Sequence, residues 1–184
     1  MKMEKHNEII RDLCREQLLS LEMFQKGRSR VYLDDNGYYL TVVEFQPSAW
    51  GKGSYLNVGL HFLWNTWEHI SFDACAGICG RVGGFVEYQN PAQFTADMSK
   101  LVALAREQVL AFREPGNVRA AVYTAKGGNA QRNRMCYQAL HTMVPGAAEQ
   151  QPLVRRLIRE KRAILRAKST TKKLPVHPEF DTEV

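Results

Sequence analysis

Hydrophobic residues recur at intervals of three and four in the first part of the chain and then change to an extended pattern. The helical spacing predicts an amphipathic helix from Glu4 to about Phe24, ending at the breaker Lys26-Gly27. Tyr38 to Phe45 is rich in β-branched and aromatic residues and is apolar on both faces, which predicts a central strand covered on both sides. The Asn36-Gly37 pair just before it is a strong hairpin signal.

Alternation is clearest from Ser54 to Trp64, where apolar side chains point to one face. The opposite face of this predicted strand is more polar and carries Tyr55, Asn57, Gly59 and His61. Two short extended segments follow, residues 69–72 and residues 85–88, with a glycine-rich loop between them. Together these segments predict an antiparallel meander of four or five strands.

Helical patterns return after residue 90. Asn90-Pro91 has the signature of an N-cap followed by proline at the first helical position, and one apolar stripe then continues to Phe112. Two shorter helices are predicted at 118–126 and 132–143, and a last one at 153–168. The predicted fold class is therefore α+β: an antiparallel sheet of about five strands in a meander, with an N-terminal helix and several C-terminal helices packed on it. Residues 1–168 are expected to form one domain and residues 169–184 a flexible tail.

Composition agrees with a single globular domain. The 184 residues are 45% hydrophobic and 24% charged, and no run approaches the roughly 18 apolar residues of a membrane span. The first residues run directly into a charged helical pattern and lack the apolar core of a signal peptide. Four scattered cysteines suit free thiols better than a disulfide framework. These features predict a cytoplasmic protein with no membrane partner.

The net charge of +6 is concentrated near the C-terminus. Residues 152–173 contain nine Lys or Arg and one Glu, a local charge of +8. Within the last predicted helix, four arginines follow helical spacing and form one stripe opposite an apolar seam. The residues that we expect to bind an acidic protein or nucleic acid are Arg155, Arg156, Arg159, Arg162, Arg166, Lys172, Lys173 and Lys52. The alternative is a helix docked on the core whose solvated face happens to be basic.

A second hypothesis concerns catalysis on the polar sheet face. Glu44, Asn57, His61 and Asp73 combine carboxylates, an imidazole and an amide, which suits a hydrolase-type acid/base site. This requires Glu44 or Asp73 to lie within hydrogen-bond reach of His61 or His69 inside a concave pocket. The alternative is a sheet face exposed to solvent, or a set of buried polar groups that are hydrogen-bonded to the loops covering the sheet.

Metal and cofactor sites are not expected. Cys75 and Cys79 have a spacing that allows two thiolates to share an ion, but zinc requires four ligands and the sequence has no second pair. A third hypothesis is an immunity-like protein that binds one protein partner through exposed tryptophans, namely Trp50, Trp64 and Trp67.

The middle of the chain resembles a family of hypothetical bacterial proteins. Phe45-Gln46-Pro47-Ser48-Ala49-Trp50 and Asn57-Val58-Gly59 match the F-Q-x-S-x-W…N-x-G core of that domain of unknown function, and Ser71-Phe72-Asp73 continues the likeness. The resemblance covers about half of the chain, to Arg113. It implies a bacterial cytosolic setting and a domain of a sheet with helices, and it implies no activity. We therefore expect a non-enzymatic binding or accessory protein, working within a bacterial multi-protein complex through its basic C-terminal helix.

Overall fold

A computed structural model describes residues 4–67, 69–75, 80–125, 129–141 and 151–168. The elements in chain order are α1 (Lys5–Gln17), the 3-10 helix η1 (Leu19–Leu21), β1 (Phe24–Gln25), β2 (Val31–Asp35), β3 (Tyr39–Gln46), β4 (Gly53–Phe62), β5 (Arg81–Glu87), α2 (Pro91–Phe112), α3 (Pro115–Thr124), α4 (Ala130–His141) and α5 (Gln151–Lys168). The predicted tail, residues 169–184, lies outside the described residues.

The five strands form one antiparallel sheet in which every strand pairs with its neighbour in sequence, in the order β1-β2-β3-β4-β5. β3 is the central strand, and it pairs with β4 from Tyr39 opposite Phe62 to Gln46 opposite Tyr55. Gly37, in the turn between β2 and β3, has a φ of 81°, a conformation that glycine adopts without steric cost. The predicted α+β class, with its five-stranded meander, N-terminal helix and C-terminal helices, is confirmed.

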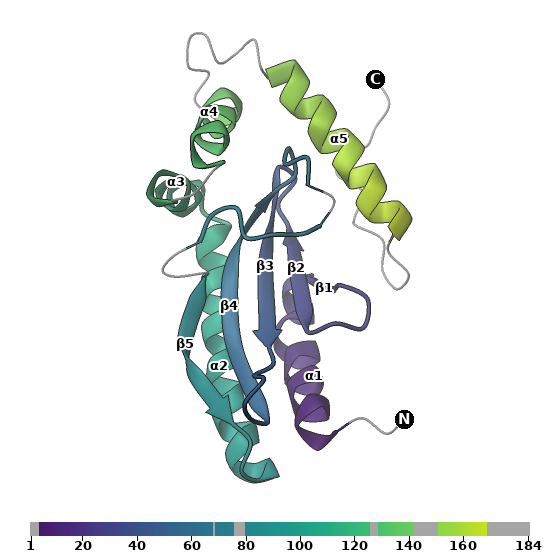
Figure 1. The fold of residues 1–184 in the computed structure, drawn as a ribbon, viewed down its shortest axis with the longest axis vertical. Coiled ribbons are helices and arrows are strands. Elements are labelled where there is room, and N and C mark those ends of the chain that lie inside the picture. The colour runs from purple at the N-terminus through teal and green to yellow at the C-terminus, as the bar shows by residue number, and fades with distance from the viewer. Residues whose placement is uncertain (1–3, 68, 76–79, 126–128, 142–150, 169–184) are drawn as a thin grey trace.

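Helices α1 and α2 cover one face of the sheet, and α2 runs along the length of β4 and β5 (Figure 1). The side chain of Asn90 caps α2 by accepting a hydrogen bond from the backbone N–H of Gln93 at 3.0 Å. The hydroxyl of Tyr39 in β3 donates to the carbonyl of Phe112 at 2.7 Å, which fixes the end of α2 against the sheet. The whole predicted apolar stripe of α2 is buried, namely Phe94, Met98, Leu101, Val102, Ala105, Val109 and Phe112.

The opposite face of the sheet is covered over only one half. Helix α5 crosses the end where β2 turns into β3 (Figure 1), and the segment after β4 folds back over that strand. Gly59 permits this close approach, because a Cβ there would lie 2.4 Å from the ring of Phe72. No described helix covers the remaining half (Figure 1). That half carries Glu44 and Gln46 of β3, which both accept from Asn57, and Tyr55, which lies opposite Gln46 on β4.

The strand prediction differs from the structure after β4. Residues 69–72, all described, form no strand, and only Ala74 bridges to Leu60. The predicted strand at 85–88 corresponds to β5, but β5 begins earlier, at Arg81, and so includes Gly83 and Gly84, which the glycine pattern had assigned to a loop. A hydrogen-bonded edge strand tolerates glycines because its backbone makes the pairing, so side-chain pattern alone gave a wrong assignment here.

The first helix is shorter than its periodicity predicts. It ends at Gln17, and Glu22 then adopts a left-handed φ of 64° that turns the chain away from the helix axis. Phe24, predicted as a helix residue, belongs to β1 and pairs with Leu33. No helix in the described residues is long and apolar enough to cross a bilayer.

Candidate functional site

The imidazole of His61 and the carboxylate of Asp73 meet on the covered half of the sheet. β4 places His61, and Asp73 is held beside it because its own N–H donates to the carbonyl of Leu60 at 2.7 Å. Nδ1 of His61 lies 3.2 Å from Oδ2 of Asp73, and Oγ of Ser71 donates to Oδ1 of Asp73 at 2.9 Å. The contact that the acid/base hypothesis requires is therefore present.

This cluster does not have the geometry of a catalytic relay. A relay uses one ring nitrogen for the carboxylate and presents the other to the reacting group. Here Ser71 and Asp73 both approach Nδ1, at 3.5 and 3.2 Å. Nε2 is buried and has no hydrogen-bond partner in the described part of the chain, and His61 is 0% exposed. The cluster therefore fastens the segment after β4 onto the sheet.

Hydrogen bonds converge on Asp73 from several directions. The N–H of Phe62 donates to it at 2.8 Å and the amide of Asn65 at 2.7 Å. Burial alone would raise the pKa of Asp73, but the bonds from His61, Phe62 and Ser71 outweigh burial and hold this pKa below its ordinary value of 3.8. The carboxylate is thus a structural anion.

We expect the Asp73→Asn substitution to lower the free energy of unfolding by about 1–3 kcal/mol at neutral pH, because a buried hydrogen-bond network loses its anion. Since the folded-state pKa of Asp73 lies below the unfolded value, the stabilisation by the carboxylate is complete above about pH 4–5 and is lost as pH falls through the folded pKa. Urea unfolding of the wild type and of the Asp73→Asn variant at neutral and acidic pH measures the two free energies of unfolding. A gap between them that stays constant into strong acid would contradict the prediction.

Glu44 and Asn57 belong to a separate polar network on the open half of the sheet. The amide of Asn57 donates to Oε2 of Glu44 at 3.0 Å and to Oε1 of Gln46 at 2.9 Å. Nε of Arg81 donates to Oδ1 of Asn57 at 2.8 Å, and the guanidinium lies 3.9 Å from the centre of the Tyr55 ring. Glu44 thus pairs with Asn57 and not with His61, so the four residues of the enzyme hypothesis do not form one site.

Arg81 is a member of this network that was not predicted from the sequence. It lies in the stretch interpreted as a glycine-rich loop, so no strand pattern placed it opposite Asn57. The register of β4 and β5 also shifts between Ser54 and Leu56, so strand periodicity alone would not have aligned Arg81 with Asn57.

The three tryptophans do not form one surface. Trp64 is 1% exposed, stacks on Phe62 with ring centres 4.5 Å apart and is part of the core. The prediction that Trp64 is exposed and contacts a partner is therefore wrong. Trp50 is 97% exposed in the loop before β4, and Trp67 is half-exposed in the segment after it. The ten residues of β4 separate these two side chains by a strand about 33 Å long.

The basic helix α5 keeps only part of its predicted stripe on the surface. Arg156 and Arg159 are exposed, and Arg155 and Arg166 are half-exposed. Arg162 is 0% exposed and forms a two-pronged ion pair with Asp35, at 2.7 and 2.8 Å. The prediction that Arg162 lies on the binding surface is therefore wrong, because its guanidinium pairs with the Asp35 carboxylate of β2 and is buried beneath the helix.

Two further predicted contacts lie away from the exposed stripe. Lys52 is at the β3–β4 loop, at the opposite end of the sheet from α5 (Figure 1), where its ammonium lies 3.5 Å from Glu4. Lys52 therefore does not extend the basic surface of α5. Lys172 and Lys173 lie outside the described residues.

The cysteines offer no metal centre within the described residues, where no three His, Cys, Asp or Glu side chains are grouped to hold an ion. Cys79 itself lies outside those residues. Burial raises the pKa of Cys14 to about 12 and also raises the pKa of Cys136, so both are neutral thiols at physiological pH.

Comparison with known proteins supplies no relative. No protein-family model, curated protein or solved structure matches this chain.

Proposed function

We propose that this chain is a non-enzymatic binding protein that engages an acidic partner through the outer face of α5. The observation that carries the proposal is the pair of exposed arginines on that face, Arg156 and Arg159, beside the partly exposed Arg155 and Arg166, in a helix whose sequence contains one carboxylate, Glu160. Glu160 lies 3.9 Å from Nε of Arg156, too loose a pair to neutralise the surface. A helix face with this excess of guanidinium groups attracts phosphates or clustered carboxylates.

The burial of Arg162 and Lys161 supports this proposal. Arg162 pairs with Asp35, and the ammonium of Lys161 donates to the carbonyl of Trp67. These contacts dock one face of α5 on the domain and turn Arg156 and Arg159 outward. The basic surface is thus presented by a helix already docked on the domain, which lowers the entropic cost of binding.

Charge reversal on the exposed face tests the proposal. We expect the double variant Arg156→Glu/Arg159→Glu to bind an acidic probe about tenfold or more weakly, because two attractive charges become repulsive. Its matched control is Arg15→Glu/Arg119→Glu, which changes two exposed arginines on α1 and α3. Each double variant takes the net charge from +6 to +2, since each substitution subtracts two.

Fluorescence anisotropy with labelled poly-glutamate and with a labelled single-stranded oligonucleotide measures both affinities and separates the two partner classes. If nucleic acid is the partner, the double variant should also show a shallower dependence of log K on log salt, by about 0.7–0.9 for each phosphate that it no longer binds. Equal weakening in the two double variants, or no binding of either probe at low ionic strength, would contradict the proposal.

Trp50 supports a second candidate, a protein-binding surface at the β3–β4 loop. Exposure of 97% is unusual for tryptophan, the residue most enriched in the energetic centres of protein interfaces. This is the form of the immunity-like hypothesis that remains once Trp64 is assigned to the core. Failure of a Trp50→Ala variant to bind a native partner, with α5 unchanged, would favour this surface over the basic helix.

A further inference from the structure

Three arginines connect helices or loops to the sheet, and they differ in how their charge is balanced. Arg162 on α5 has the carboxylate of Asp35 at 2.7 Å. Arg113, just after α2, has the carboxylate of Asp34 at 2.8 Å on the other face of the same strand. Arg30, just before β2, is half-buried and more enclosed than Arg113. No carboxylate lies within ion-pair distance of Arg30 in the described part of the chain.

The hydrogen-bond partners of Arg30 are neutral oxygens. Its guanidinium donates to Oδ1 of Asn7 and, at 3.5 Å, to the carbonyl of Gly53. The carboxylate of Glu4 contributes to the electrostatic surroundings of Arg30, but it already lies 3.5 Å from the ammonium of Lys52. Burial lowers the pKa of Arg30, which means that the protein does not fully replace the water that hydrates this cation in the unfolded chain.

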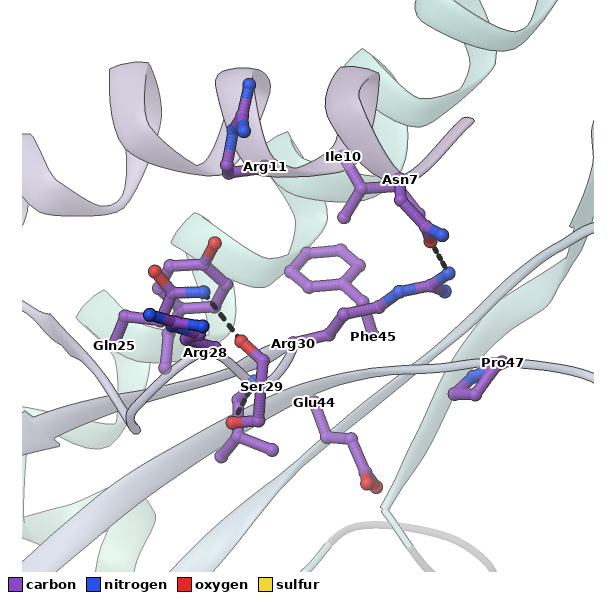
Figure 2. Close-up of a pocket in the computed structure, with 12 residues that line it drawn as sticks. Asn7, Ile10, Arg11, Gln25, Arg28, Ser29, Arg30, Glu44, Phe45 and Pro47 are labelled. Carbon is purple, nitrogen blue, oxygen red and sulfur yellow. Dashed lines mark hydrogen bonds between the residues drawn. The ribbon is translucent and has the colours of Figure 1, made fainter. Parts of the chain in front are cut away.

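A cavity of about 450 Å³ opens beside this cation, between α1 and the strands β2 and β3 (Figure 2). Two other arginines line it, Arg11 and Arg28. Arg11 is paired with Asp12 at 2.9 Å, whereas Arg28 is exposed. Figure 2 shows the guanidinium groups of Arg28 and Arg30 on opposite sides of the Phe45 ring.

Glu44 is the one carboxylate among the lining residues, and it does not balance this charge. Its side chain points away from Arg30 in Figure 2, and it accepts a hydrogen bond from Asn57 on the other face of the sheet. The rest of the lining includes apolar groups, among them Ile10, Val31 and Pro47. The cavity therefore combines an unbalanced cation, a second cation and an apolar wall, in a volume typical of small-molecule sites.

We propose that this cavity binds a small organic oxyanion, with its phosphate or carboxylate group on Arg30 and its organic body along the apolar wall toward Arg28. A guanidinium presents five N–H donors in a planar fork, and the contacts to Asn7 and Gly53 leave some of them available. The bound anion supplies the counter-charge that Asp34 and Asp35 supply to the other two arginines. This site is independent of α5 and of the acidic partner proposed for it.

Calorimetric titration with inorganic phosphate, phenyl phosphate and benzoate tests the site. We expect saturable binding of at least one probe by the wild-type protein. Phenyl phosphate should bind more tightly than inorganic phosphate because its ring contacts the apolar wall, and its comparison with benzoate tells which oxyanion is preferred. Arg30→Gln should weaken binding about tenfold or more. Arg28→Gln should weaken it less, and Arg119→Gln, which removes an exposed charge on α3, should leave it unchanged.

Two measurements keep the test decisive if Arg30→Gln fails to fold. The Arg30→Lys variant keeps the charge but loses the planar fork, so it should fold and bind with intermediate affinity. In the wild-type protein, the side-chain N–H resonances of Arg30 should shift on titration with phenyl phosphate while those of Arg119 stay in place. Absence of saturable binding of all three probes, or equal affinity in Arg30→Gln and wild type, would overturn the proposal.

Discussion

The Asp35→Asn substitution should lower the free energy of unfolding by about 3–5 kcal/mol, because it removes the charge of the carboxylate that bonds both terminal nitrogens of the buried Arg162 guanidinium. Arg162 is 0% exposed, and both its terminal nitrogens bond to the Asp35 carboxylate. The asparagine has nearly the same shape as the aspartate, so the difference measures charge and not packing. Urea unfolding at neutral pH, followed by circular dichroism, gives the free energy for both proteins.

The double variant Asp35→Leu/Arg162→Met should recover most of this stability. Apolar side chains of similar volume avoid the desolvation of both charges, and such replacements are often neutral or stabilising. An exposed pair serves as the control: Asp97→Asn removes the partner of Lys100, 3.1 Å away, and should leave the unfolding midpoint nearly unchanged. A small effect of Asp35→Asn, equal to that of Asp97→Asn, would mean that α5 is not held by a buried ion pair.

The Trp64→Ala substitution should also destabilise the protein by about 3–5 kcal/mol, because it removes a large core side chain and leaves a cavity. Trp64 stacks on Phe62, and its indole N–H donates to Oδ1 of Asn133 at 3.4 Å. It therefore joins the segment just after β4 to α4, and its removal also leaves the buried amide of Asn133 without this partner. Thermal and urea unfolding measure the effect.

Trp50→Ala is the matched control, since it removes the same side chain from a position that is 97% exposed. Its free energy of unfolding should stay within about 0.5 kcal/mol of the wild-type value. This contrast separates a tryptophan that serves the fold from one that is available to a partner. Equal stabilities for the two variants would contradict the burial of Trp64.

These predictions bear on the proposed binding surface. The arginines of α5 divide into Arg162, which docks the helix, and a set that includes Arg156 and Arg159, which face outward. A variant that changes Arg162 would confound weaker binding with lower stability. The functional test therefore uses the two exposed arginines alone.

Much of the fold follows from local sequence patterns. Alternation predicts β4, the apolar run on both faces predicts β3 as the central strand, and Asn36-Gly37 predicts the turn before it. Asn90 and the apolar stripe after it predict α2. These elements were predictable because each depends on residues within a few positions of one another, where periodicity reports which side chains share a face.

The sites depend on contacts that no local pattern contains. Asp34 and Asp35 look like part of a hairpin turn, yet they pair with Arg113 and Arg162, which lie 79 and 127 residues away in sequence. Because successive residues of a strand point to opposite faces, one aspartate holds the helix end on one face and the next holds α5 on the other. Helical spacing placed Arg162 with the exposed arginines, and only the position of Asp35 decided that it is buried.

The sequence by itself thus determined the class of fold, the central strands, the longest helix and the concentration of positive charge in α5. The tertiary structure alone decided which charged and aromatic side chains are buried. It brought Asp73 to His61, separated Glu44 from both, enclosed Trp64 and left Arg30 without a carboxylate in the part of the chain that the structure describes. The physical reason is that burial of a charge depends on whether an opposite charge reaches it in space, and a chain's periodicity carries no information about that distance.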